Sequence, residues 1–189
     1  MQPTVVRGII PAMDAPDDRP LALDDPGMRA WARFLHAQAT ILRRLEAELQ
    51  GAHELGLGEF EALLQLSLAD LGRLRMSELA DRLVLSRSGV TRLVDRLESA
   101  GDVARVTCAS DARGSFAELT DAGRVRLREA LPTHVQGVRE HFVDRVPPDE
   151  LDRLARTLEL LAAPTPTVDA TCASVLTAAT ESEAVPVAG

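Results

Sequence analysis

The stretch that decides the fold is Leu79–Gly101, which reads LADRLVLSRSGVTRLVDRLESAG. Its first residues form one apolar helical turn. Ser86 then occupies an N-cap position, because its hydroxyl can accept a hydrogen bond from an exposed backbone N–H. An apolar stripe at helical spacing follows and predicts the buried face of a second helix. The stripe consists of Val90, Leu93, Val94 and Leu97. Gly101 comes after the last turn, as a C′ glycine does. The stretch therefore predicts a short helix, a turn and a longer helix, the pattern of a helix-turn-helix motif.

Arginine and small hydroxyl side chains occupy the other faces of this second helix. They are Arg87, Ser88, Thr91, Arg92 and Arg96. Because the N-terminal half of such a helix enters the major groove, the first four are expected to contact base edges and nearby phosphates. Ser86 and Arg96 are expected to contact phosphate. A plain pair of amphipathic helices with a solvated arginine face stays open as the alternative.

The composition favours a protein built from packed helices. Of the 189 residues, 46% are hydrophobic but only five are aromatic, so the core must consist mainly of Leu, Val and Ala. No apolar run approaches the roughly 18 residues that cross a bilayer, and the first residues make a poor signal peptide. We therefore expect a cytoplasmic protein that does not bind a membrane. The two cysteines, Cys108 and Cys172, fit a reducing compartment, and the scattered histidines predict neither a metal site nor a cofactor.

Charge is distributed unevenly along the chain. The formal net charge of −8 argues against a general polyanion-binding protein. Residues 73–124, however, hold nine arginines against eight acidic residues, whereas the rest of the chain holds twelve against 21. The relatively basic part is therefore the part that contains the helix-turn-helix motif.

Composition and helical patterns also suggest how the chain is divided. Residues 1–24 contain four prolines and an acidic cluster and predict a disordered arm, and residues 164–189 lack a helical stripe and predict a disordered tail. The helices within 25–55 and 121–163 carry more apolar surface than one small domain covers, so we expect them to be dimerisation helices. Residues 56–120 are expected to form the lobe that contains the motif.

The expected helices outside the lobe have recognisable ends. The first is capped by Asp24 or Asp25, has Pro26 in its first turn and extends to about Gly51. Its apolar stripe from Trp31 to Leu49 predicts a partner helix in the same chain or in another. Another begins after Thr120 and extends to about Val146. We expect Pro132 to kink or break it. A final amphipathic helix covers Leu151–Leu161.

A β-hairpin is expected after the motif. Residues 103–109 alternate as a strand does, Ser110–Gly114 predicts a turn, and Ser115–Leu119 returns as a second strand. A very short strand is also possible at Leu74 and Arg75. The predicted fold class is thus mainly α with a small β-hairpin wing, a winged helix-turn-helix inside an all-α dimerisation frame.

With these elements in this order, the chain resembles a member of the MarR (multiple antibiotic resistance regulator) family. The matching residues are Ser77–Ala80, Ser86–Arg92, Asp95–Glu98, Gly101, Asp111-x-Arg113 and Leu119-Thr120-x-x-Gly123. The resemblance covers roughly Asp25 to Ala162. It implies a sequence-specific, DNA-binding regulator of transcription, and we expect a repressor.

The wing residues Asp111, Arg113 and Gly114 are expected to bind DNA. Arg113 at a hairpin tip can place its guanidinium in a narrow minor groove, and Asp111 can hold that group by a charge-assisted hydrogen bond. Gly114 permits a sharp turn. An ordinary surface ion pair is the alternative for the two charged residues. The wing departs from the family pattern at Ala112, Ser115 and Glu118, where many members carry basic residues. Fewer phosphate contacts and a flatter salt dependence are then expected.

The resemblance also implies a homodimer in which the first and last helices of two subunits interleave. Such a dimer would bind palindromic double-stranded DNA with its two recognition helices about one turn, roughly 34 Å, apart. Many family members release DNA when a small phenolic or other aromatic anion binds. Candidate ligand residues here are Trp31, Phe34, His36 and Arg43. Core or interface packing of the two aromatic residues is the alternative. Cys108 could serve as a redox switch, with a small buried or edge residue as the alternative.

Two other classes of function compete with a DNA-binding regulator. An enzyme is not expected, because the sequence contains no nucleophile elbow, phosphate loop or zinc motif. Nearby arginines explain Asp95, Glu98 and Asp102 as surface pairs. An interaction protein that kept the winged-helix fold but lost DNA binding stays open, because the net charge is negative and the wing carries Ala112 and Glu118.

Overall fold

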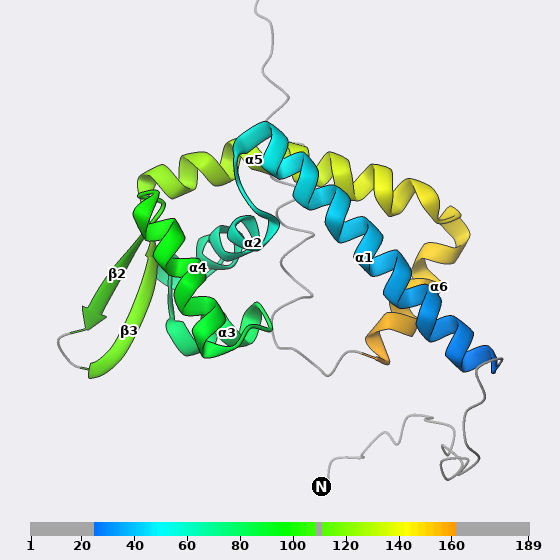
Figure 1. Ribbon diagram of the computed structural model, residues 1–189, viewed down its shortest axis with the longest axis horizontal. Coiled ribbons are helices and arrows are strands. Elements are labelled where there is room, and N and C mark those ends of the chain that lie inside the picture. Colours follow the sequence, from blue (N-terminus) through cyan, green and yellow to red (C-terminus); the bar gives the residue numbers. More distant parts are fainter. Residues whose placement is uncertain (1–24, 109–110, 162–189) are drawn as a thin grey trace, which may run out of the picture. The chain divides into compact units, whose positions relative to one another are not determined.

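The computed structural model describes residues 25–108 and 111–161, except for the side chains of residues 107–114 (Figure 1). The helices are α1 (Pro26–His53), α2 (Leu57–Ser67), α3 (Met76–Arg82), α4 (Arg87–Ser99), α5 (Asp121–His141) and α6 (Pro148–Glu159), with short 3₁₀ turns η1 (Asp70–Gly72) and η2 (Val143–Arg145). The strands are β1 (Arg73–Arg75), β2 (Val103–Cys108) and β3 (Asp111–Leu119). The predicted arm and tail lie outside the described residues. The chain divides into two compact units between Gln38 and Ala39, inside α1.

The three strands form one antiparallel sheet in the order β1-β3-β2. The predicted boundary between turn and strand is wrong, because β3 begins at Asp111 and not at Ser115. Thr107 pairs with Ser115 and Cys108 with Asp111, so the residues between Asp111 and Ser115 have no partner on β2. An irregularity of this kind lets one strand carry extra residues. Asp111, Arg113 and Gly114 therefore belong to the start of β3.

The core lies between α2, α3, α4, the sheet, α5 and the part of α1 that follows Ala39. The predicted stripe of α4 is buried along its whole length, which confirms the helical pattern there. In α1, Leu45 and Leu49 are buried, whereas Trp31 and Phe34 are 54% and 41% exposed. No residue of α6 is buried. Within the described residues, the apolar side chains at the start of α1 are therefore largely exposed, and those of α6 are at most half-buried.

Several predicted helix ends are present in the structure. The hydroxyl of Ser86 accepts from the N–H of Gly89 (3.1 Å), and that of Thr120 accepts from the N–H of Gly123 (3.0 Å), so both residues are N-caps. Gly101, at φ +82°, closes α4: its N–H donates to the carbonyl of Glu98 (3.0 Å), and the N–H of Asp102 donates to that of Leu97 (2.9 Å). Pro132 does not break α5, which continues through it, so that half of the predicted kink or break is wrong and the kink stays a prediction. The helix ends at His141 instead of about Val146. Across the described residues, no helix is sufficiently long and apolar to span a membrane.

Candidate nucleic-acid interface

The N-terminal half of α4 presents a polar, exposed surface. Ser86, Arg87, Ser88, Thr91 and Arg92 are all exposed. The Ser86 and Ser88 hydroxyl oxygens lie 3.1 Å apart, and the Thr91 hydroxyl donates to the carbonyl of Arg87 (2.8 Å). Within the described residues, the guanidinium groups of Arg87 and Arg92 have no hydrogen-bond or ion-pair partner. This end of the helix therefore offers two cations to an external anion, with hydroxyl groups beside them.

Arg96 differs from these arginines, although it lies on the same helix. Its Nε is 2.7 Å from Oε1 of Glu59 on α2, and the other oxygen of Glu59 accepts from the N–H of Gly56 (3.1 Å). The Arg96 side chain is still 60% exposed. The predicted phosphate contact of Arg96 would thus use a guanidinium that already binds a carboxylate.

Arg105 on β2 attaches the wing to α4 and was not among the predicted site residues. Its guanidinium lies 2.6 Å from the carboxylate of Asp95 and 3.1 Å from that of Glu98, and it donates to the carbonyl of Thr91 (3.2 Å). The sequence signal for this contact was present, because Asp95 and Glu98 are three residues apart on one helix face and an arginine follows on the next strand. This clamp fixes where the wing strand lies relative to the exposed half of α4.

A hollow of about 530 Å³ lies where α3, α4 and the sheet meet. Its lining includes three arginines, Arg75, Arg87 and Arg105, and the hydroxyl residues Ser77, Thr91 and Ser115. Arg75 also lies over the ring of Phe116 at 4.9 Å. The hollow extends the positive surface of α4 toward β1. Arg75 is not among the predicted site residues either. Exposed Arg73 and Arg75 alternate with buried Leu74, so both arginines lie on the outward face of β1.

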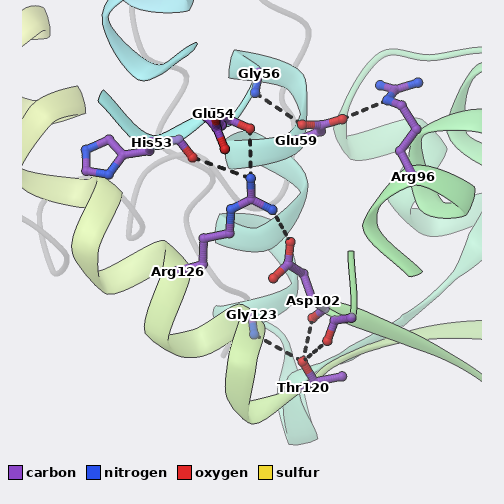
Figure 2. A network of polar contacts seen from close by, with 10 residues as sticks. His53, Glu54, Gly56, Glu59, Arg96, Asp102, Thr120, Gly123 and Arg126 are labelled. Atoms are coloured by element: carbon purple, nitrogen blue, oxygen red, sulfur yellow. Dashed lines mark hydrogen bonds and ion pairs between the residues drawn. The ribbon is translucent and has the colours of Figure 1, made fainter. Parts of the chain in front are cut away.

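The C-terminal end of α4 meets the start of α5 in a tight polar junction (Figure 2). The carbonyl of Asp102 accepts from the N–H and the hydroxyl of Thr120, both at 3.0 Å. A Cβ on Gly123 would lie 2.2 Å from that same carbonyl oxygen, so only glycine fits there. The Leu119-Thr120-x-x-Gly123 pattern therefore has a structural cause: it brings the end of the wing and the start of α5 against the turn after α4.

The remaining predicted site residues fall into two groups. The side chains of Asp111 and Arg113 lie outside the described part of the structure, and for Gly114 only its place in β3 is described. Among the candidate ligand residues, the rings of Trp31 and Phe34 stack with centroids 6.0 Å apart, and His36 on the same unit is exposed. Arg43 belongs to the second unit, where its guanidinium donates to the Thr40 hydroxyl (3.4 Å). Over the described residues, no three His, Cys, Asp or Glu side chains gather to hold a metal ion.

Comparison with known proteins identifies the family. The family model for MarR matches residues 57–115. AbsC, a MarR family transcriptional regulator from Streptomyces coelicolor, superimposes with a TM-score of 0.69 and is 36% identical, over 76% of this chain and 95% of AbsC. The chain belongs to the MarR family of transcriptional regulators. The resemblance inferred from the sequence motifs and the expected fold class are thereby confirmed.

Two further relatives bear on function. Sco3205 from Streptomyces coelicolor, a MarR family transcriptional regulator solved in complex with DNA, has a TM-score of 0.71 and 31% identity over 79% of this chain and 97% of its own. The transcriptional repressor MprA of Escherichia coli is 29% identical over 128 residues, which are 66% of this chain and 71% of MprA. The family model covers α2 to the first half of β3, the part that contains the exposed end of α4.

Proposed function

We propose that this MarR-family chain binds a palindromic DNA operator as a homodimer and represses transcription. The observation that carries the proposal is the N-terminal half of α4, where three hydroxyl residues and two arginines without a side-chain partner among the described residues are exposed together. Arginine forks suit guanine edges and phosphates, and the N-terminal half of a recognition helix is the part that reaches them. The DNA complex of Sco3205 and the repressor name of MprA support the same function. A DNA partner also supports the expected cytoplasmic location.

The uncovered apolar residues support the homodimer. In α1, Trp31, Phe34 and Leu35 are exposed, and Leu160 and Leu161 are exposed directly after α6. Large apolar side chains clustered on a surface are typical of an interface. A two-fold dimer that buries both faces would set two α4 helices about one turn of DNA apart, or roughly 34 Å. A sedimentation measurement that finds only monomer at micromolar concentration would contradict it.

The wing is proposed as the second DNA contact, on the sequence motif alone. Arg113 would enter the minor groove with Asp111 and Gly114 beside it, while Ala112 and Glu118 would reduce the number of phosphate contacts. Substitution of Arg113 by alanine should weaken binding to all DNA sequences, because a minor-groove arginine contributes mainly shape and charge recognition.

The decisive experiment is a selection from random double-stranded DNA, followed by fluorescence anisotropy with the enriched sequence. The wild-type protein should enrich a palindrome. The double variant Arg87→Ala/Arg92→Ala should bind it about 10- to 100-fold more weakly, with a smaller salt slope. Arg128→Ala on α5 is the matched control, because Arg128 is exposed and far along the chain from α4. A wild-type protein that enriches no sequence would instead favour the interaction protein that has lost DNA binding.

A small aromatic anion is proposed as the effector that releases the DNA. The stacked, exposed rings of Trp31 and Phe34 support it, since apolar rings suit the ring of an aromatic carboxylate. His36 and Arg43 are proposed from the sequence alone as partners of its carboxylate. Such a ligand can act only if it binds the DNA-incompetent state more tightly. Titration of the DNA complex with salicylate should release the operator, and Arg43→Ala should reduce that release. Salicylate at millimolar concentration with no effect on DNA affinity would remove this ligand class.

A further inference from the structure

Arg126 on α5 joins three separate parts of the structure (Figure 2). One of its terminal nitrogens lies 2.5 Å from the carboxylate of Asp102, directly after α4. The other donates to the carbonyl oxygens of Glu54 (2.8 Å) and His53 (3.4 Å), at the end of α1. A single guanidinium therefore connects the ends of α1 and α4 to α5.

The chemistry of this contact makes it hard to replace. Asp102 is the only buried charged residue in the described part of the chain, and its side chain is 5% exposed. A buried carboxylate requires a charged, hydrogen-bonded partner. The last carbonyls of a helix lack partners within the helix and carry the negative end of its dipole, so a cation suits them as well. Only the fork of an arginine can bind the carboxylate with one nitrogen and the carbonyls with the other.

A second set of contacts joins the turn between α1 and α2 to α4. Glu59 on α2 binds both the N–H of Gly56 and the guanidinium of Arg96, in the last turn of α4. Glu46 of α1 accepts from the N–H of Leu57 (2.6 Å). The turn between α1 and α2 is thus connected to the C-terminal end of α4 twice, while the N-terminal half of α4 stays exposed.

We propose that Arg126 and Asp102 are positioning residues that fix the direction of α4 relative to the C-terminal half of α1 and to α5. In the dimer, this pair would determine which spacing between operator half-sites is accepted. The inference rests on the proposed DNA-binding function and deepens it. Inserting one base pair between half-sites moves one of them by about 3.4 Å and rotates it by about 35°. A rigidly held α4 cannot follow that change, whereas a released one can.

The test measures spacing discrimination instead of affinity alone. The selected palindrome is resynthesised with its spacer shortened or lengthened by one and two base pairs, and each Kd is measured by fluorescence anisotropy. The wild-type protein should lose about tenfold or more in affinity for each one-base-pair change, and Arg126→Met about threefold or less. The selected half-site sequence should be the same for both proteins, because neither residue lies on the exposed half of α4.

Two further variants separate positioning from folding. Asp102→Asn keeps the shape of the side chain but removes its charge. It should flatten the spacing profile, which is the dependence of Kd on spacer length, as Arg126→Met does. Arg128→Met on the same helix, whose side chain is exposed, should keep the wild-type profile. A variant that is only less stable contains less folded protein and binds operators of every spacer length more weakly by the same factor. The ratio of the Kd values between spacer lengths therefore reports positioning.

Three outcomes decide the inference. A flattened profile in both Arg126→Met and Asp102→Asn, with an unchanged half-site, supports it. An unchanged profile, or an equal loss on every spacer, overturns the positioning role and leaves the DNA-binding function intact. A wild-type protein that enriches no DNA overturns that function, and the positioning role with it.

Discussion

The two ends of α4 have opposite surroundings, although they belong to one helix of 13 residues. At the N-terminal end, Arg87 and Arg92 are exposed and have no partner in the described part of the chain. At the C-terminal end, Arg96 binds Glu59, and the turn after the helix carries the buried pair of Asp102 and Arg126. One end is available to a ligand, and the other is attached to the rest of the fold.

The two ends of one helix are therefore subject to different constraints. Side chains that stay exposed contribute little to folding, so they can be chosen for what they bind. Side chains within a connected polar junction depend on one another, so removing one of them lowers the free energy of unfolding. Substitutions at the two ends should therefore have different signatures: loss of DNA affinity with normal stability at the first, and loss of stability or geometry at the second.

The largest expected effect is at the attached end, in Gly123→Ala. The new Cβ would lie 2.2 Å from the Asp102 carbonyl oxygen and 2.8 Å from a Leu119 methyl carbon, and the backbone atom cannot move away cheaply. We expect a loss of about 3 kcal/mol in the free energy of unfolding, measured by urea denaturation. The matched control is Ala122→Gly, at an exposed neighbouring position of the same helix turn, which should cost about 1 kcal/mol or less. Equal losses in the two variants would show that the junction tolerates a shift.

The next effect compares two arginines one helical turn apart. Arg92→Ala should lower the affinity for the operator by about 1–3 kcal/mol and change the preferred sequence, with an unchanged melting temperature. Arg96→Ala should lower the stability by up to about 1 kcal/mol, because it removes a largely exposed ion pair with Glu59. Anisotropy and thermal denaturation of both variants measure the contrast. If Arg96→Ala were the one that changed sequence preference, the assignment of the two ends would be reversed.

The helix-turn-helix itself could be predicted because its signals are local. Ser86, the stripe beginning at Val90 and Gly101 lie within a few turns of one another, and each acts on its own helix. The strand bounds were less predictable, because the residues Ser110–Gly114 have turn chemistry whether or not they belong to a strand. Periodicity also shows that the face of α1 with Trp31 is apolar, but it does not show what covers that face.

The partners at the attached end could not be predicted, for a physical reason. Glu59 lies 37 residues from Arg96, and Arg126 lies 24 residues from Asp102. Such pairs depend on how whole helices pack, and each charge alone has the pattern of a solvated surface residue. The sequence pattern therefore predicts which end of α4 binds a ligand, but it does not indicate what holds the other end.

A smaller effect is expected where the chain turns at either end of α4. Val84, before the helix, has φ +53° and is 91% exposed, whereas Gly101, after it, has φ +82° with open space around it. A β-branched residue is strained in this left-handed region and glycine is not. Val84→Asn should therefore stabilise the fold by about 1 kcal/mol, and Gly101→Ala should destabilise it by a similar amount. A loss of stability in Val84→Asn, measured by urea denaturation, would mean that the valine has a packing role.

The smallest effect is a pH dependence of the stability, and it arises where α5 packs against α2. His134 stacks on Phe60 with ring centroids 4.4 Å apart, and its Nδ1 has no hydrogen-bond partner among the described residues. Burial lowers the pKa of His134 from its ordinary value of about 6.5. Below about pH 6.5 the unfolded chain takes up a proton at this histidine before the folded one does, so stability falls as the pH falls.

His134→Leu should remove this part of the pH dependence while keeping an apolar contact with Phe60. The free energy of unfolding is measured by urea denaturation between about pH 8 and pH 5 for both proteins. At about pH 8 the histidine is neutral in the folded and unfolded states, so the difference there reports packing alone. Below about pH 6.5 the wild-type protein should lose more stability than the variant. Parallel curves of the free energy of unfolding against pH would instead mean that protonation of His134 does not destabilise the folded protein. The packing against Phe60 would then not depend on a neutral ring.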